Sequence, residues 1–140
     1  MPTPFTASLT ASFFGLDLNM KGYLSDFPIM SDVLRRLGTV RLHANCIALV
    51  QFDRQRLLRL EVSGRVGDVQ SIVGALERVT RKSQYIIHSL FISVPMLFRR
   101  EEFSNFLSAL STQAPDLQNL TIKRRPNGWI TLRIQFTYAD

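Results

Sequence analysis

Apolar residues recur at helical spacing in three stretches of this chain, and each stretch has its own boundary signals. Their i, i+3, i+4 and i+7 pattern gives one apolar stripe, as an amphipathic helix requires. Gly38 is suited to end the first helix, Asp68 to cap the second at its N-terminus, and Pro115 to close the third. The predicted helices are 28–37, about 69–82 and about 99–113.

The segments between these helices are typical of β-strands. Residues 58–63 alternate between apolar and polar side chains, as a half-buried strand does. Residues 84–94 are apolar on both faces, which is typical of a central strand, and 40–52 are rich in Val, Leu and Ile. A hairpin of 117–124 with 129–138 is predicted to end the chain.

The loop of this C-terminal hairpin sets its register. A three-residue loop, 126–128, pairs Ile122 with Leu132 and Leu120 with Ile134, so that apolar residues share one face. It also places Pro at the first turn position and Gly at the left-handed position that such a loop prefers. A two-residue loop would mix the two faces. The sequence therefore predicts the three-residue loop.

This order of elements predicts an α+β protein. We expect a sheet of about five strands, packed by two longer helices and one short helix, in a single domain over residues 27–140. Residues 1–26 are left open as an arm, a short edge strand or a linker remnant. Phe13 and Phe14 are expected to dock on the domain or on a partner, since large apolar side chains seldom stay exposed together.

The charge of the chain bears on its partners. The 140 residues carry a net charge of +6, with 14 Arg against 3 Lys and a pI near 10.2. A basic balance favours nucleic acid, anionic lipid or an acidic protein surface, and arginine suits interfaces of every kind. Cys46 is the single cysteine, so an intramolecular disulfide and a cysteine-based zinc site are excluded. No apolar run is long enough to span a bilayer.

The hairpin register brings basic and aromatic residues to one outer face. Such a cluster suits base stacking, cation–π contacts or a protein hot spot. It is equally compatible with an ordinary solvated face, on which a Trp packs on Arg side chains or is covered by the N-terminal segment. The predicted binding patch is Lys123, Arg125, Trp129, Thr131 and Arg133.

Candidate catalytic groups are few. His43 and Cys46 are three residues apart on a predicted strand and therefore point to opposite faces, which argues against a Cys–His pair. His88 lies among apolar residues and is expected to be a hydrogen-bonded core histidine. No nucleotide-binding, zinc or nucleophile-elbow motif occurs. We therefore expect a non-enzymatic chain without a metal or cofactor.

One short motif has two interpretations. Gly64, Arg65 and Gly67 have the GxxG spacing of the loop with which KH domains clamp the nucleic-acid backbone, so they form a candidate phosphate loop. The KH loop joins two helices, whereas the residues before Gly64 alternate like a strand. A plain turn from a strand to a helix explains the same glycines.

Two long segments resemble a known family. The segment LRLEVSGRVGDVQSIVGALERVTRKSQYIIHSLFIS and the segment EEFSNFLSALSTQAPDLQNLTIKRRPNGWITLRIQFTYAD resemble the periplasmic domains of type IV pilus alignment proteins and of their type II secretion counterparts, the PilN/PilO type. In that family a strand ending in Gly leads into a helix, a further strand follows, and a helix with two strands ends the domain. The resemblance covers about residues 28–140 and rests on apolar spacing.

The resemblance implies a ferredoxin-like core and a scaffold role beside the inner membrane, on its periplasmic side. It carries over no site residues. Those proteins also have a cytoplasmic tail, a membrane helix and a coiled coil, so this chain would be an excised domain or a divergent relative. Without the resemblance, a cytoplasmic location is expected.

Two functions remain as hypotheses. The first is a protein-interaction or assembly module that forms a homo- or heterodimer. The second is a nucleic-acid-binding domain that uses the outer face of the hairpin and the 64–67 loop.

Overall fold

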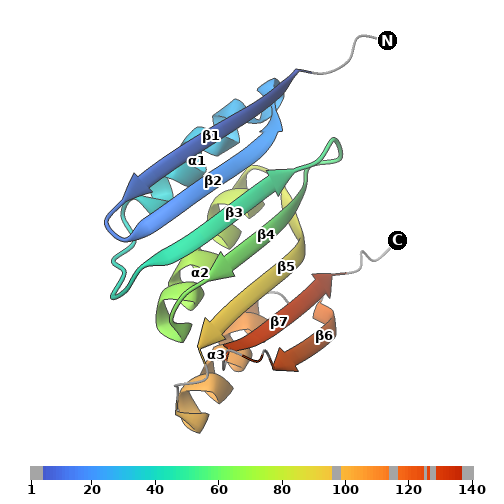
Figure 1. Cartoon of the computed structure of the whole chain (residues 1–140). Helices are drawn as coiled ribbons and strands as arrows, with labels where there is room; N and C mark the ends of the chain where they lie inside the picture. Colours follow the sequence, from blue (N-terminus) through green and yellow to red (C-terminus); the bar gives the residue numbers. More distant parts are fainter. Residues whose placement is uncertain (1–4, 96–98, 114–116, 125, 127–128, 137–140) are drawn as a thin grey trace.

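A computed structural model shows one mixed β-sheet with its helices on one side (Figure 1). It describes residues 5–95, 99–113, 117–124, 126 and 129–136. The strands are β1 (Thr6–Phe13), β2 (Leu16–Tyr23), β3 (Cys46–Phe52), β4 (Leu57–Ser63), β5 (Ile86–Pro95), β6 (Leu117–Arg124) and β7 (Trp129–Phe136). The helices are α1 (Phe27–Leu37), α2 (Val66–Lys82) and α3 (Arg100–Gln113), with a short 3-10 turn at Leu24–Asp26.

The sheet grows along the chain in the order β1-β2-β3-β4-β5-β7-β6. The β2 strand continues through α1 into the parallel strand β3, and β4 continues through α2 into the parallel strand β5. Crossovers of this kind are almost always right-handed, and these two advance in the same direction along the sheet. Their helices therefore lie on the same face, as Figure 1 shows for α1 and α2 behind the strands.

The core lies between the sheet and these helices. Every second residue of the central strands points toward the helices and is buried, for example Leu18, Val50 and Leu60. Met30 of α1 and Ile72 of α2 are fully buried against them. This alternation is the strand pattern that the sequence shows, and the buried layer fixes which side of the sheet is left for other contacts.

The observed arrangement confirms an α+β protein, but the ferredoxin-like arrangement is not confirmed. From β2 to β5 the elements do follow the βαββαβ order. A ferredoxin-like sheet, however, splits each βαβ unit with another strand. Here the parallel partners β2 and β3 are adjacent, as are β4 and β5, and the sheet has seven strands instead of about five.

Residues 6–23 form the first hairpin of the sheet. The chain reverses at Phe14 and Gly15, which both have positive φ (45° and 85°) as a tight two-residue hairpin loop requires. The β1 strand is an edge, whereas β2 lies inside the sheet and buries Leu16, Leu18 and Met20. The segment left open as an arm, an edge strand or a linker is thus part of the sheet.

Asp68 is not the N-cap of α2, as the sequence suggested. The helix begins at Val66 with Arg65 as its cap residue, and Asp68 is buried in the first turn. Its carboxylate accepts the backbone N–H groups of His43 and Ala44 at 3.0 and 3.1 Å. Those bonds fix the loop before β3, which explains why the strand starts at Cys46 instead of near residue 40.

A second buried carboxylate joins distant segments at the other end of the sheet. Asp26 accepts the Tyr23 backbone N–H at 2.8 Å and the Tyr85 hydroxyl at 2.7 Å. The Tyr85 ring meets Phe52 edge-on, with 5.6 Å between ring centres. Burial, followed by the hydrogen bond to Asp26, raises the pKa of Tyr85 to about 12. The hydroxyl therefore remains a donor at neutral pH.

Replacing this hydroxyl tests the Asp26–Tyr85 contact. Tyr85→Phe should lower the free energy of unfolding by about 1–2 kcal/mol, the low end for a bond to a charged group because Tyr85 is partly exposed. Chemical denaturation at neutral pH measures this.

The same variant should change the alkaline pH dependence. A folded pKa raised from 10.0 to about 12 favours the folded state below pH 10, and this contribution is lost as the pH rises toward 12. The wild type should therefore lose more stability than Tyr85→Phe between pH 10 and 12. Equal losses would contradict the contact.

Candidate functional site

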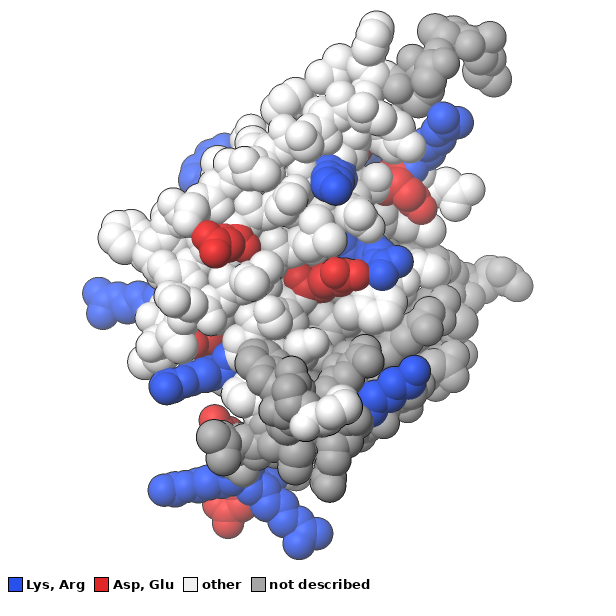
Figure 2. Space-filling view, in the orientation of Figure 1, with Lys and Arg blue, Asp and Glu red and all other residues white. Residues whose placement is uncertain are grey.

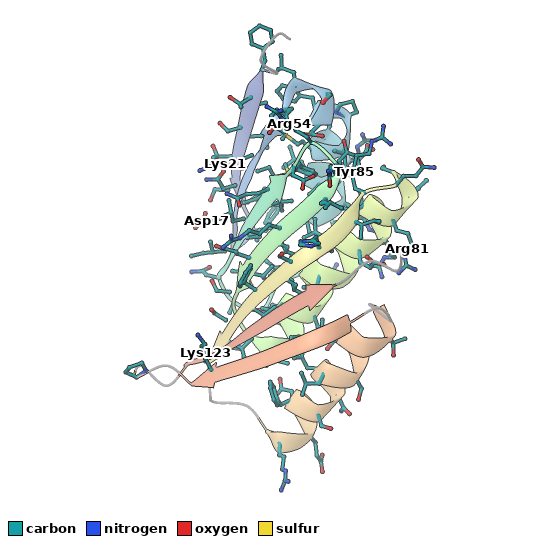
Figure 3. The ribbon with its side chains drawn as sticks, turned by 90° about the vertical axis from the view of Figure 1, so that its right-hand side faces the viewer. Asp17, Lys21, Arg54, Arg81, Tyr85 and Lys123 are labelled. Atoms are coloured by element: carbon teal, nitrogen blue, oxygen red, sulfur yellow. The ribbon has the colours of Figure 1, made fainter. Side chains whose placement is uncertain are left out.

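The sheet has one uncovered side, which we call the open face. It consists of the strand residues that point away from the helices. Figure 3 shows Asp17, Lys21 and Lys123 on this side, opposite the helices. The open face includes Thr6, Ser8, Thr10 and Ser12 of β1, Asp17, Asn19 and Lys21 of β2, Ile47, Leu49 and Gln51 of β3, Arg59, Glu61 and Ser63 of β4, Phe91 and Ser93 of β5, and Lys123 of β6.

Apolar side chains lie at the centre of the open face. Ile47 of β3 is 59% exposed, which is high for an isoleucine on an interior strand. Leu49, on the same face, is half-buried. Phe91 of β5 lies under the Arg59 guanidinium, 4.5 Å from the ring centre, and Arg59 also pairs with Glu61 at 2.8 Å. The centre therefore combines apolar surface with an internally neutralised ion pair.

The open face carries only part of the basic excess of the chain. Its acidic residues are Asp17 and Glu61, its basic residues with described side chains are Lys21, Arg59 and Lys123, and the register adds Arg133 of β7 opposite Phe91. Figure 2 shows that the described part of this face is mostly uncharged, with most of its positive groups projecting from the rim. Other basic residues lie on helices or before them, namely Arg35, Arg36, Arg78, Arg81, Lys82, Arg99 and Arg100.

Two hollows mark the open face near β1 and β2. The larger, of about 580 Å³, is lined by Ser8, Lys21, Gln51 and Arg59 among others. The smaller, of about 400 Å³, lies between Thr10, Asn19 and Ile47. Both hollows are open to solvent and shaped by polar and apolar groups together, which suits the side chains of a partner.

One acceptor in the smaller hollow has no hydrogen-bond partner among the described residues. It is the Oδ1 atom of Asn19, which the surrounding side chains shield from solvent. A shielded carbonyl oxygen costs free energy unless a donor reaches it. A donor from outside would reach this oxygen only if the side chains that shield it moved.

The predicted basic and aromatic patch falls on the border of this face. Lys123 is exposed on β6. The register places Trp129, Thr131 and Arg133 of β7 opposite Pro95, Ser93 and Phe91 of β5, respectively, and Thr131 also lies opposite Lys123. Arg125 lies outside the described residues. In the hairpin itself, Ile122 lies opposite Leu132 and Leu120 lies opposite Ile134. Residues 127 and 128 of the predicted loop lie outside the described residues.

The candidate phosphate loop is the turn from β4 into α2. Gly64 donates its N–H to the Ser93 carbonyl at 3.1 Å, and a Cβ there would lie 2.5 Å from Cys46 Sγ. Packing against Cys46 therefore requires this glycine. Arg65 is an exposed cap residue, and Gly67 faces open space. No structural feature of this turn brings Arg65 to the open face.

Of the groups considered for catalysis, His43 and Cys46 both lie near Asp68, and His88 lies on another strand. His43 lies in the loop before β3, largely exposed, with Nδ1 3.2 Å from Asp68 Oδ1. Burial, and then the nearby Asp68 charge, raises the pKa of Cys46 to about 11, so its thiol stays protonated at neutral pH. His88 is not a core residue: it is half-buried at a bulge in β5, with Nδ1 3.1 Å from Ser89 Oγ, and it lines the larger hollow.

Sequence analysis did not identify the centre of the open face. The signal was the pattern of 46–52, where Ile47 and Leu49 are apolar although they alternate with buried residues. Such a strand is apolar on both sides, and the pattern cannot say which side a helix covers. No sequence pattern identified Lys21 and Gln51, because they line the larger hollow only when β2 and β3 are neighbours in the sheet.

Comparisons with protein-family models, with curated proteins and with solved structures find no match to this chain. The geometry of the open face is therefore the basis for the function proposed below.

The glycine pair of the 64–67 turn gives a test of its structural role. Gly64→Ala should destabilise the fold by about 1–3 kcal/mol, because the added methyl group overlaps Cys46 Sγ. Gly67→Ala, in the same turn, should be neutral or stabilise by up to about 1 kcal/mol, since nothing lies within 4 Å of its Cβ. Thermal and chemical denaturation measure both.

The Cys46 contact also predicts non-additivity. Cys46→Ala removes the overlapping sulfur, so the double variant with Gly64→Ala should lose less stability than the two single costs together. Additive costs would show that Gly64 is required for another reason.

Proposed function

We propose that this chain is a non-enzymatic protein-interaction module that binds a partner protein through the open face. The observation that carries the proposal is the apolar surface on this face, above all Ile47, which is 59% exposed on the interior strand β3. Exposed apolar side chains among polar ones are typical of protein interaction sites. The Asp17 and Lys21 side chains are among these polar groups.

The arrangement of charge favours a protein partner over nucleic acid. A nucleic-acid interface needs a basic groove or stripe that follows the phosphates. On the open face the basic positions are interrupted by Asp17 and Glu61, and Arg59 is already engaged by Glu61 and Phe91. A stacked Arg beside a Phe is a common protein hot-spot arrangement.

The unpaired Asn19 acceptor supports the same conclusion. A partner that moves the shielding side chains and seats a donor in the smaller hollow would satisfy Oδ1 and bury Ile47 beside it. Both gains arise only on binding. The larger hollow, with Lys21 and Arg59 in its lining, would take an acidic side chain of the partner.

We place this module in an assembly role, in line with its resemblance to inner-membrane scaffold domains of pilus and secretion systems. The resemblance covers residues 28–140, whereas the open face also includes β1 and β2. The N-terminal hairpin would thus add two strands to the scaffold surface. Among the described residues no helix is both long and apolar enough to cross a membrane.

Substitution at the centre of the open face tests the proposal. A partner captured from the source organism by a photo-crosslinker at position 47 is purified, and its affinity is measured for the wild type and for Ile47→Asp. Introducing a charge into a desolvated apolar contact should weaken binding at least tenfold, about 1.4 kcal/mol. The melting temperature should change little, because Ile47 is already largely exposed.

Leu24→Asp is the matched control. Leu24 is 49% exposed and lies outside the sheet, so its substitution should leave the affinity unchanged. Unchanged affinity in Ile47→Asp would overturn the role of the open face. Nucleic acid that co-purifies with the chain and is released by salt would favour the alternative function.

A further inference from the structure

The first edge of the sheet presents a row of free backbone groups. Phe13 and Leu16 flank the two-residue hairpin loop, so they form a hydrogen-bonded pair, and alternate residues of β1 bond to β2 from there. The Leu24 N–H group bonds to Phe5 O at 3.0 Å, in agreement with this alternation. The backbone groups that point away from the sheet belong to Thr6, Ser8, Thr10 and Ser12, whose residues are all exposed.

The β1 strand itself lacks several of the features that usually prevent strand pairing. Residues 6–13 contain no charged residue and no proline, and their pairing with β2 has no bulge. Natural proteins protect exposed edges with such features, because an unprotected edge recruits another strand. The opposite edge, β6, does carry charge, at Lys123 and Arg124.

The sequence of this edge is self-complementary. Residues 5–13 read FTASLTASF, which has the same residue types from either end if Ser and Thr are treated as equivalent. Leu9 is the centre of this palindrome. A two-fold axis between antiparallel copies of one strand brings each residue opposite its mirror position, so a palindromic sequence places like residues opposite one another.

We propose that β1 pairs antiparallel with β1 of a second copy of this chain, about a two-fold axis at Leu9. The register places like residues opposite one another: Leu9 with Leu9, Ala7 with Ala11, Ser8 with Thr10, Thr6 with Ser12, and Phe5 with Phe13. One side of the joined strands carries only hydroxyl groups, and the other carries only apolar groups. No ionisable side chain lies opposite its own copy.

Phe5 gives this register its largest apolar gain. It is 76% exposed in the single chain, and Phe13 is half-buried against the core. The two-fold axis repeats the Phe5–Phe13 pair, so Phe5 of each copy packs against Phe13 of the other copy. A shift of the axis to Thr10 would place Phe5 opposite Gly15 and forfeit these contacts.

Pairing at β1 would join two seven-stranded sheets into one. Directly opposed residues of an antiparallel pair share a face, so both open faces would lie on the same side of the joined sheet and all helices on the other. The inference rests on β1 alone and does not need the proposed function to hold.

Charge substitutions at positions 8 and 10 test the pairing and its register. These residues are exposed and lie opposite each other across the proposed axis. The S8E/T10E variant places two carboxylates opposite each other twice, whereas S8E/T10K places a carboxylate opposite an ammonium group twice. Both variants share the glutamate that faces Lys21 within the chain, so they differ only at position 10.

Molar mass by light scattering, over a wide range of concentration, is the readout. We expect the wild type and S8E/T10K at twice the 16.0 kDa of the chain and S8E/T10E at 16.0 kDa, all with equal helical circular dichroism. A monomeric wild type, or a dimeric S8E/T10E, would overturn the pairing. A monomeric S8E/T10K would overturn the register centred on Leu9.

The outcome separates this inference from the proposed function. Ile47→Asp should remain a dimer, because Ile47 lies on β3 and does not contact β1 of the second copy. A dimeric Ile47→Asp with weakened partner binding would leave the pairing intact, whereas a monomeric Ile47→Asp would place the dimer contact on the open face instead of at β1.

Discussion

The handedness of two crossovers is the constraint on which the rest of this structure depends. Both β2–α1–β3 and β4–α2–β5 join adjacent parallel strands and advance in the same direction, so their helices must cover the same face. One side of the sheet is buried in consequence, and the other keeps Ile47 and Phe91 outside the core. The location of the candidate surface follows from connectivity, before any side chain is considered.

Two buried carboxylates then fix the loops that these crossovers require. Asp68 binds the chain that enters β3, and Asp26 joins the entry of α1 to Tyr85 before β5. A buried carboxylate is stabilising only when donors satisfy it, and each of these accepts at least two. The polar interior therefore supports the sheet geometry, while the open face and the β1 edge remain for assembly.

Sequence patterns predicted the helices well, because α1, α2 and α3 each bury one stripe. They missed the hairpin of 6–23, since the small and hydroxyl side chains of β1 give little apolar contrast on an edge strand. They also placed Asp68 at a cap, because a capping residue and a loop anchor look alike in sequence. The open face could not be located, because Ile47 and Leu60 are both apolar strand residues in the sequence. Only the position of the helices makes Ile47 exposed and Leu60 buried.

Carbene footprinting of the chain, alone and bound to its natural partner, is the most direct test that the open face is the binding surface. The account predicts that labelling of the peptide containing Ile47 and Leu49 falls on binding, while labelling of the exposed side of α2 around Arg78 is unchanged. Protection of the helical side with unchanged labelling at Ile47 would contradict it.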